Sequence, residues 1–411
     1  MSLPPVSVVV VSRGRPEALR LCLTGLAQLS YPAFEVVVVA DPQGIAAARA
    51  HAFGATFKCV PFDEPNISAA RNAGIDHAAG EILAFVDDDA VPEPTWLTYL
   101  IAPFSEGRVA AAGGYVRGRN GISLQWAGRR LDALGQPSVL ALPDDAARAF
   151  TPAPGTAIKT EGTNMAVRRS VLRQLGGFDP AYHFFLDETD LNMRLAAAGH
   201  ATALVPKAQV HHGFAASSRR RADRVPTDLF DIGASWAVFQ RKFVPQDQRR
   251  AHWLETRGSE RRRLVRLMVQ GSLEPRDVRR LMRRLDLGYG QGIERATGNG
   301  QIRAVAKVPF AAMPGGSGVH RVITARWRQR AKARKQAKDA VKNGAVVTLL
   351  LLSPTSLFHH ARFHPDGYWE QTGGQFGRSV RTDSIFRPWR FSARAKRELS
   401  RICAIRGSAQ A

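Results

Sequence analysis

Three short runs of apolar, mostly β-branched residues constrain the fold most strongly. They read VSVVVVS at 6–12, EVVVV at 35–39 and ILAFV at 82–86. Runs of this length without polar alternation are typical of strands that are buried on both faces of a sheet. Helices are expected between them, over 16–29, 45–53 and 68–79. Repeated β-α units predict an α/β fold with a mostly parallel, Rossmann-like sheet flanked by helices, and its ligands are expected at the carboxyl ends of the strands.

The balance of charge divides the chain near residue 217. Residues 1–216 contain 18 Lys and Arg against 20 Asp and Glu, whereas residues 217–411 contain 40 against 15. Such an asymmetry indicates two units with different partners. The basic half is expected to be mainly helical, over 227–243, 249–268 and 322–341. Glycines cluster at both ends of 288–318, which predicts a linker or mobile loop. The expected units are therefore 1–218, 219–287, 288–320 and 321–411.

Several classes of protein are excluded by simple counts. The three cysteines, Cys22, Cys59 and Cys403, are too far apart for a disulfide framework or a metal knuckle. The apolar run at 345–352 is far shorter than the roughly 20 residues of a membrane-spanning helix. The first residues lack the basic stretch of a secretory signal. The sequence therefore predicts a cytoplasmic protein without a transmembrane segment.

Three adjacent carboxylates, Asp87, Asp88 and Asp89, follow directly after the expected strand at 82–86. Neighbouring carboxylates repel one another unless a cation neutralises them, and Mg²⁺ and Mn²⁺ prefer oxygen ligands. Residues i and i+2 of a strand end face the same side, so Asp87 and Asp89 are candidate ligands of one ion. The alternative is a solvated acidic loop that caps the helix near 94–96.

Four segments occur in a characteristic order, and the second of them ends with this acidic cluster. They are the opening segment VSVVVVSRGRP to VVAD at 6–41, NISAARNAGIDHAAGEILAFVDDD at 66–89, EGTNMAVRRSVLRQLGGFD at 161–179 and FFLDETDLNMRLAAAGHATALVPKAQVHH at 184–212. Together they resemble a family 2 glycosyltransferase of the GT-A fold, over about residues 5–218. The resemblance implies that an inverting enzyme transfers one sugar from a nucleotide-diphosphate sugar to a glycan or lipid-linked acceptor. It also implies Mn²⁺ or Mg²⁺ as cofactor and a role in cell-envelope polysaccharide synthesis.

The resemblance assigns roles to individual residues. Those that match the donor site are Ser12, Arg13, Asp41, Arg71, Asn72, Asp87 and Asp88. Those that match metal ligands are Asp87, Asp89 and His212, with His211 as the neighbouring alternative. Thr163 and Asn164 match the acceptor-side strand. Ala40 stands where the family carries a further acidic residue, so recognition of the nucleotide base differs here from the usual pattern.

The acidic segment Asp187-Glu188-Thr189-Asp190 matches the place of the catalytic base. Glu188 holds the position of the carboxylate that takes a proton from the acceptor hydroxyl. The order of Asp and Glu is reversed from the usual one, so Asp187 is also a candidate, and Asp190 is assigned to holding the start of the helix. The alternative is an acid-rich helix N-terminus that the helix dipole stabilises.

The basic half allows several interpretations. The arginines of 217–224 suit phosphate oxygens and could close over the donor diphosphate, or they form a solvated linker. The tryptophan-containing basic segment at 322–341 suits an anionic membrane surface, which would make the protein peripheral to the membrane. The aromatic residues of 363–379 either stack on sugars or pack in a loop. Nucleic acid is not expected, because no nucleic-acid-binding motif accompanies the charge.

Two rival functions were weighed against glycosyl transfer. A sugar-nucleotide nucleotidyltransferase would need a glycine-rich phosphate loop with a lysine after the first strand, which SRGRPE at 12–17 lacks. A non-catalytic basic binding protein on a degenerate transferase scaffold would not need Asp87, Asp89 and Glu188 intact. The QxxRW segment of processive membrane synthases is missing, which favours the addition of a single sugar. The sequence does not predict the oligomeric state.

Overall fold

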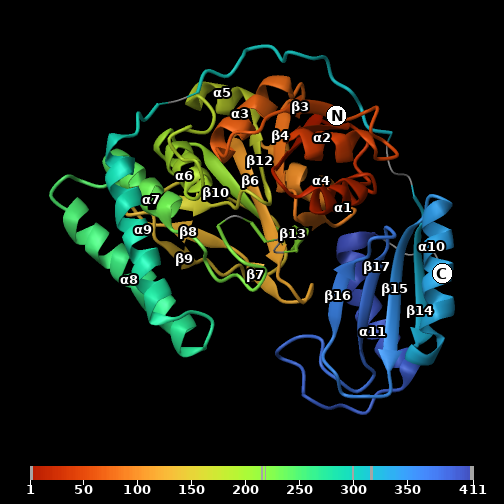
Figure 1. Ribbon diagram of the computed structural model, residues 1–411. Coiled ribbons are helices and arrows are strands. Elements are labelled where there is room, and N and C mark those ends of the chain that lie inside the picture. Colours follow the sequence, from red (N-terminus) through yellow and green to blue (C-terminus); the bar gives the residue numbers. More distant parts are fainter. Residues whose placement is uncertain (1–2, 214–215, 218, 299, 315–317, 408–411) are drawn as a thin grey trace.

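The computed structural model describes residues 3–407 except 214–215, 218, 299 and 315–317. Figure 1 shows a large sheet between helices, a helical extension on one side of it, and a smaller lobe with its own sheet on the other. A long segment without helix or strand runs over the top of the large sheet and joins the extension to the lobe. The cavity described below lies in the large unit.

The large sheet contains ten strands, eight of them in the order β10-β13-β6-β12-β4-β1-β2-β3. Their bounds are β1 Val6–Ser12, β2 Phe34–Ala40, β3 Lys58–Pro61, β4 Ile82–Asp87, β6 Val109–Arg117, β10 Arg148–Phe150, β12 Met165–Arg168 and β13 Ala201–His212. Strands β3, β2, β1 and β4 are parallel, and β13 is parallel to β6. β12 lies antiparallel between β4 and β6, so the sheet is mixed beyond its parallel half.

Helices cover both faces of this sheet. They are α1 Pro16–Leu26, α2 Pro42–Arg49, α3 Ile67–His77, α4 Trp96–Ile101, the 3₁₀ helix Ala102–Ser105, α5 Arg169–Leu175 and α6 Asp187–Ala197. Val8 and Val10 pack in one apolar cluster with α1, whereas Val9 packs on the opposite face against α3. Burial on both faces explains why β1 has no polar alternation. The parallel β-α units predicted from the sequence are therefore present.

An insertion between β6 and β12 forms one wall of the cavity. It contains β7 Leu124–Trp126, β8 Arg129–Leu131, β9 Pro137–Val139 and β11 Ala157–Lys159, and β11, β8 and β9 make a separate three-stranded sheet. The short strand β5 (Ala90–Pro92) follows the acidic cluster and pairs with β13.

The extension consists of α7 Phe230–Phe243, α8 Arg249–Val269 and α9 Pro275–Glu294. Gly288 lets α9 approach α7 closely, because a Cβ atom there would lie 1.9 Å from the carbonyl oxygen of Phe230. Gly292 makes a similar approach to Ala234. The prediction of a linker from residue 288 is therefore wrong at its start, since these glycines belong to a helix contact and α9 continues to Glu294.

Residues 300–313, where the sequence predicts a linker or mobile loop, form a strap that packs against the large sheet. Ile302 and Met313 are buried in the two apolar clusters of that sheet. The backbone N–H of Lys307 donates to the carbonyl oxygen of Asp76 at 2.8 Å, and that of Ala311 donates to the buried carboxylate of Glu35 at 2.8 Å. These contacts are distributed along the strap, whose path over the large sheet is seen in Figure 1.

The C-terminal lobe, residues 320–407, is a small α/β unit. It contains β14 His320–Arg326, the 3₁₀ helix Trp327–Gln329, α10 Arg330–Lys342, β15 Val346–Ser353, β16 His360–Phe363, β17 Trp369–Gly374 and α11 Phe391–Arg406, with strand order β14-β15-β17-β16. The predicted helix over 322–341 is wrong in its first part, because residues 320–326 form an edge strand. Tyr368 and Trp369 are buried, so these aromatic residues pack in the lobe.

The observed architecture confirms the predicted fold class, an α/β sheet with a mainly helical basic extension. The sheet of the C-terminal lobe was not predicted. Among the described residues, no helix is both long and apolar enough to cross a membrane.

Candidate active site

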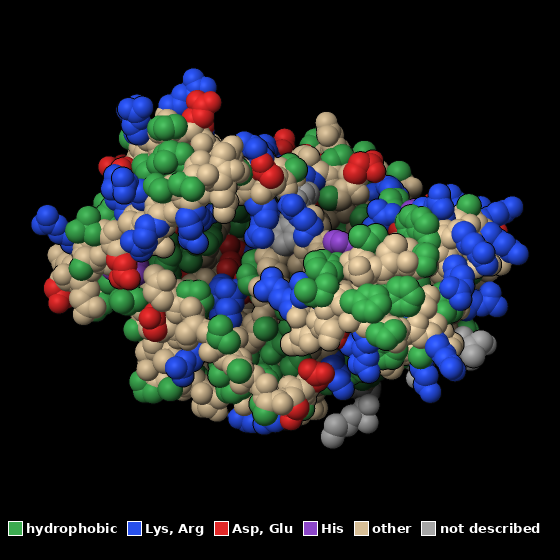
Figure 2. Space-filling model, turned by 90° about the horizontal axis from the view of Figure 1, so that it is seen from below, with side chains coloured by type: hydrophobic (Ala, Val, Ile, Leu, Met, Phe, Trp, Pro, Cys, Tyr) green, Lys and Arg blue, Asp and Glu red, His purple; other side chains and the backbone are tan. Residues whose placement is uncertain are grey.

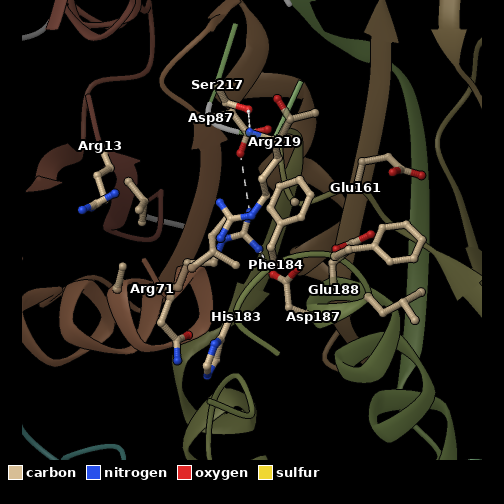
Figure 3. Close-up of a pocket in the computed structure, with 18 of the residues that line it drawn as sticks. Arg13, Arg71, Asp87, Glu161, His183, Phe184, Asp187, Glu188, Ser217 and Arg219 are labelled. Atoms are coloured by element: carbon tan, nitrogen blue, oxygen red, sulfur yellow. Dashed lines mark hydrogen bonds and ion pairs between the residues drawn. The ribbon is translucent and has the colours of Figure 1, made fainter. Parts of the chain in front are cut away.

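A cavity of about 650 Å³ opens where β1 and β4 end and α6 begins. This is the edge at which parallel sheets usually bind their ligands. Figure 3 shows Arg71 between Asp87 at the end of β4 and Asp187 at the start of α6, with Glu188 and Glu161 on the opposite side. The cavity therefore has an acidic end at the sheet and a second group of carboxylates on α6 and the insertion.

Asp87, Asp89 and His212 could hold a metal ion, because one ligand atom of each lies within 4.8 Å of the others. Nε2 of His212 is 3.2 Å from Oδ1 of Asp89. The pairing of β5 with β13 places Ala90 opposite His212, and the N–H of Gly213 donates to the carbonyl oxygen of Asp89 at 2.6 Å. Two carboxylates and one imidazole suit Mn²⁺ better than Mg²⁺.

Three arginines balance the charge of this acidic end. Arg15 lies 2.5 Å from Asp88 and 3.4 Å from Asp89. Arg220 lies 3.5 Å from Asp89, and Arg71 lies 3.5 Å from Asp87. Guanidinium groups also suit phosphate oxygens, so the same arginines can serve an anionic ligand.

The acidic end of α6 is set by an unusual turn. Phe185 and Leu186 both have left-handed backbone conformations, with φ of 72° and 64°. Such conformations are uncommon for residues other than glycine and often occur at functional sites. The turn directs the two following carboxylates toward the cavity, and Leu186 is buried beneath it.

Asp187 and Glu188 differ in exposure and in partner. The side chain of Asp187 is 3% exposed and is ion-paired with Arg71, whereas that of Glu188 is 17% exposed and accepts a hydrogen bond from Nζ of Lys159 at 2.7 Å. Burial raises the pKa of Asp187 to about 7, although the positive charge of Arg71 lowers it. The nearby carboxylate of Glu188 adds to the rise. Burial would also raise the pKa of Glu188, but Lys159 outweighs it and lowers the pKa to about 2. Glu188 is thus ionised across the neutral range.

Four aromatic residues, Trp126, Phe184, Phe185 and Trp236, lie on the wall of the cavity. The ring of Trp126 lies beside the acidic end, 5.8 Å from the imidazole of His212. Arg219 lies over the ring of Phe184, 4.7 Å from its centre, and the Phe185 and Trp236 rings meet edge to face at 6.1 Å. Aromatic faces can stack on sugar rings, so the cavity combines charged groups with side chains that suit a less polar ligand.

Nine of the residues singled out from the sequence line this cavity: Ser12, Arg13, Arg71, Asp87, Asp89, Thr163, Asp187, Glu188 and His212. They come from six different segments of the chain. His211 points to the other side of β13, where its Nε2 lies 2.7 Å from Glu93. The alternation of side chains along a strand predicts this difference between His211 and His212.

Five others are not on the cavity wall. Asn72 forms two hydrogen bonds with the backbone of Phe178. Asn164 is fully buried and accepts a hydrogen bond from Nε1 of Trp96. In this structure both amides fix the backbone or a buried indole, and their contacts with donor and acceptor stay predictions.

The remaining three are carboxylates with internal partners. Asp41 caps α2 by accepting from the N–H of Gly44 at 2.8 Å. Asp88 is buried and accepts from Oγ of Ser12 at 2.7 Å, and burial raises its pKa to about 7 despite Arg15. Asp190 is paired with Arg194 at 2.7 Å and also with Lys242 on α7. A direct contact of Asp41 or Asp88 with the donor stays a prediction.

The wall residues that sequence reasoning missed include Arg15, Trp126, Arg129, Lys159, Glu161 and Trp236. Glu161 opens the segment that carries Thr163 and Lys159 lies two residues before it, so their position was the available signal. Of the basic segment 217–224, Arg220 reaches the acidic end as described above, and Arg219 pairs with Asp231 at 2.6 Å. Ser218 lies outside the described residues.

Comparison with known proteins agrees with this site. The family described as "Glycosyltransferase like family 2" matches residues 4–225, which is more than half of the chain. The chain belongs to this glycosyltransferase family. All nine predicted residues on the cavity wall fall within the matched segment.

Individual relatives match parts of the chain. The O-antigen biosynthesis protein RfbC of Myxococcus xanthus is 30% identical over 258 residues, which are 58% of this chain and 19% of that protein. A pre-mycofactocin glycosyltransferase of Mycobacterium tuberculosis is 29% identical over 214 residues, 50% of this chain and 42% of that one. The chain thus spans less than half the length of these relatives. A crystal structure of GalNAc-T7 with UDP, GalNAc and Mn²⁺ shares 16% identity at a TM-score of 0.44, over 58% of this chain and 48% of that one.

Proposed function

We propose that the protein is an inverting glycosyltransferase that moves one sugar from a nucleotide-diphosphate sugar to a hydroxyl group of a glycan or lipid-linked acceptor. The observation that carries the proposal is the cavity itself, in which the strand-end group Asp87, Asp89 and His212 faces the helix-borne carboxylate of Glu188. Membership of glycosyltransferase family 2 supports it. Residues 1–218 would form the catalytic domain.

The acidic end would receive the donor. Asp87, Asp89 and His212 would hold Mn²⁺ or Mg²⁺, and the bound ion would neutralise charge on the departing diphosphate. Arg15 and Arg220 lie beside these carboxylates and would turn to the diphosphate oxygens when the donor binds. Ser12 and Arg13, at the end of β1, would contact the nucleoside, with Asp41 and Asp88 supporting this end from behind.

Glu188 would act as the base. Its carboxylate is ionised and more exposed to the cavity than that of Asp187, which is held by Arg71. The acceptor hydroxyl would give its proton to Glu188 while its oxygen bonds to the anomeric carbon. The bond from that carbon to the diphosphate breaks on the opposite face, and its electron pair leaves with the diphosphate. A single displacement of this kind inverts the anomeric configuration.

Aromatic residues of the cavity wall would bind the acceptor sugar. Phe184, Trp236 and Thr163 line the same cavity as Glu188. The name of the RfbC relative, an O-antigen biosynthesis protein, supports a glycan acceptor in cell-envelope polysaccharide synthesis.

A basic surface with exposed apolar residues would place the protein on the cytoplasmic face of a membrane. Leu357, Phe358, Ile385 and Phe386 of the C-terminal lobe are each at least 51% exposed, and Arg378 lies over Phe358. Figure 2 shows green patches bordered by blue on this lobe, on the same face as a hollow with acidic side chains inside it. Apolar side chains surrounded by cations suit an anionic bilayer.

Vesicle binding tests the membrane part. The protein should sediment with anionic vesicles at low salt and be released at high salt, since each Lys or Arg near the surface contributes about 1 kcal/mol that salt screens. The variant Phe358→Ser with Phe386→Ser should bind more weakly, whereas Leu254→Ser with Leu287→Ser on α8 and α9 is the matched control. Equal binding to anionic and neutral vesicles would contradict the idea.

A donor panel tests the transferase function. The protein is incubated with nucleotide sugars and Mn²⁺ or Mg²⁺, and sugar release and transfer are followed with the anomeric configuration of the product. Inverted transfer or slow donor hydrolysis that depends on the metal is expected. Formation of a nucleotide sugar from a sugar phosphate would favour a nucleotidyltransferase, and binding without any turnover would favour a non-catalytic scaffold.

A further inference from the structure

Lys159 is a buried ammonium group between two carboxylates of the cavity wall. It is the last residue of β11, and its side chain is 8% exposed. Its Nζ donates to Oε1 of Glu188 at 2.7 Å and to Oγ1 of Thr189 at 3.0 Å. Oε2 of Glu161 lies 3.9 Å away on the other side. The ammonium group is thus hydrogen-bonded to one carboxylate and within reach of a second.

Each of the three carboxylates around this lysine has a cationic partner. Glu161 is ion-paired with Arg129 on β8, and Asp187, the neighbour of Glu188 on α6, is ion-paired with Arg71 on α3. Among the described residues, Lys159 is the cation that hydrogen-bonds Glu188, since Arg71 and Arg129 are directed to other carboxylates. The state of Glu188 therefore depends chiefly on where the Lys159 ammonium lies.

We propose that Lys159 is a positioning residue of the transfer reaction, which holds Glu188 ionised and aimed into the cavity and then shifts to Glu161 when Glu188 accepts the proton. The inference rests on the proposed function, in which Glu188 is the base. It assigns Glu161 the part of a second counter-ion for Lys159.

The balance of charge during transfer explains why two carboxylates are needed. When the acceptor proton moves to Glu188, that carboxyl becomes neutral and Lys159 loses its partner. A buried ammonium without a counter-ion is strongly unfavourable. Glu161 is the nearest anion, and Arg129 keeps it in place. The positive charge of Lys159 is thus compensated both before and after the proton moves.

The acid limb of the pH–rate profile tests the proposal. An opposite charge within hydrogen-bond distance lowers the pKa of a carboxyl group by roughly 1–3 units. In Lys159→Met the acid limb of kcat should therefore move up by at least about one pH unit. Lys159→Arg keeps the charge and should return the acid limb to the wild-type position.

A matched variant separates this effect from the loss of any buried lysine. Lys242 on α7 is paired with Asp179 and Asp190 and does not contact Glu188. Lys242→Met should leave the acid limb at the wild-type pH. A folded Lys159→Met enzyme with the wild-type acid limb would show that Lys159 has a structural part only, and would overturn the proposal.

A second variant tests the role of Glu161 as counter-ion, and it keeps the proposal testable if Lys159→Met does not fold. Glu161→Gln removes the second counter-ion, so kcat should fall by on the order of tenfold while the acid limb does not rise. Wild-type turnover in Glu161→Gln would overturn the shift to Glu161. Failure of the proposed function has a different signature, because the wild-type protein would then transfer no sugar from any donor.

Discussion

The cavity and the interior of the C-terminal lobe both bury charged residues, but they use them differently. In the lobe, Glu398 accepts from Gln371 at 2.9 Å and from Ser379 at 3.0 Å, and it lies 3.2 Å from Arg394. Arg394 in turn lies 2.9 Å from His359. These groups are held by one another and pack between α11 and the sheet.

In the cavity, by contrast, the acidic groups face an open volume of about 650 Å³. Asp87, Asp89 and Glu188 have partners, but those partners, Arg15, Arg71, Arg220 and Lys159, line or border the same space and can exchange them for a ligand. Burial of charge is therefore a poor guide to a functional site. What distinguishes the two regions is whether the charged groups reach a space that a ligand can enter. Substitutions should accordingly cost rate in the cavity and stability in the lobe.

The largest effect is expected from Asp89→Asn. Loss of one carboxylate ligand should lower metal-dependent turnover by about 10³-fold or more, because the ion would otherwise contribute several kcal/mol to the transition state. The melting temperature should change little, because the relief of repulsion between Asp89 and its acidic neighbours offsets the loss of its pairs with Arg15 and Arg220. Turnover with Mn²⁺ is measured beside Asp144→Asn, an exposed acid far from the cavity wall. Wild-type turnover in Asp89→Asn would refute the metal assignment.

Glu188→Gln should lower turnover by roughly 10²- to 10⁴-fold, the usual contribution of a general base. The amide preserves the shape of the side chain, so donor affinity should change little. The companion variant is Asp187→Asn, measured for turnover and donor affinity in parallel. If Asp187→Asn is inactive and Glu188→Gln is active, the catalytic base is Asp187. If both variants are active, neither carboxylate of this helix is the base.

Glu398→Gln tests the expectation that a substitution in the interior of the C-terminal lobe costs stability and not rate. Breaking one partner of a buried ion pair costs about 3–5 kcal/mol, because the remaining charge is left uncompensated. Urea unfolding should show this loss, while kcat per folded molecule stays at the wild-type value. A large fall in kcat without a loss of stability would mean that the lobe interior acts on the reaction.

The contact between the large unit and the C-terminal lobe, here called the joint, should stabilise the fold in a pH-dependent way. Glu93 of the large unit is buried, forms an ion pair with Arg406 of α11 and is hydrogen-bonded to His211 of β13. Burial opposes the charge of Glu93, but Arg406 and His211 together hold its pKa far below the usual value. A lowered pKa in the folded state means that Glu93 stabilises the fold above its unfolded pKa of about 4.3, and that this stability is lost as the pH falls below it.

Glu93→Gln should therefore lower the free energy of unfolding at pH 7, and the difference from the wild type should shrink below about pH 4. Glu17→Gln is the control, because the pair of Glu17 with Arg20 is exposed and contributes about 1 kcal/mol or less. A difference that stays constant from pH 7 to pH 3 would contradict the account of the joint.

Local sequence was sufficient for the elements that build the acidic end. The runs of β1, β2 and β4 are buried on both faces, and such strands have a clear local signature. The position of Asp87 and Asp89 after β4 follows directly, and His212 came from the family resemblance. The parallel half of the sheet and one side of the site were thus predictable.

What local sequence does not specify is the partner of a polar side chain on a distant segment. Asn72 and Asn164 have the chemistry of ligand-binding residues, yet their amides satisfy the backbone of Phe178 and the indole of Trp96. Lys159 lies close in sequence to a predicted site residue, but its contact with Glu188 is made across the fold. The pattern of residues 322–341 predicts a helix, whereas residues 320–326 form the strand β14, because its edge position leaves room for exposed arginines.

The strap at 300–313 has a consequence for the independence of the C-terminal lobe. Met313 is anchored in the large unit, and six residues separate it from His320, so the lobe can move at most about 25 Å from this anchor. A short tether gives an effective concentration in the millimolar range between the surfaces it joins. If the Glu93–Arg406 joint opens, the lobe re-docks before it can exchange with another molecule, so the joint behaves as an intramolecular contact even when it is weak.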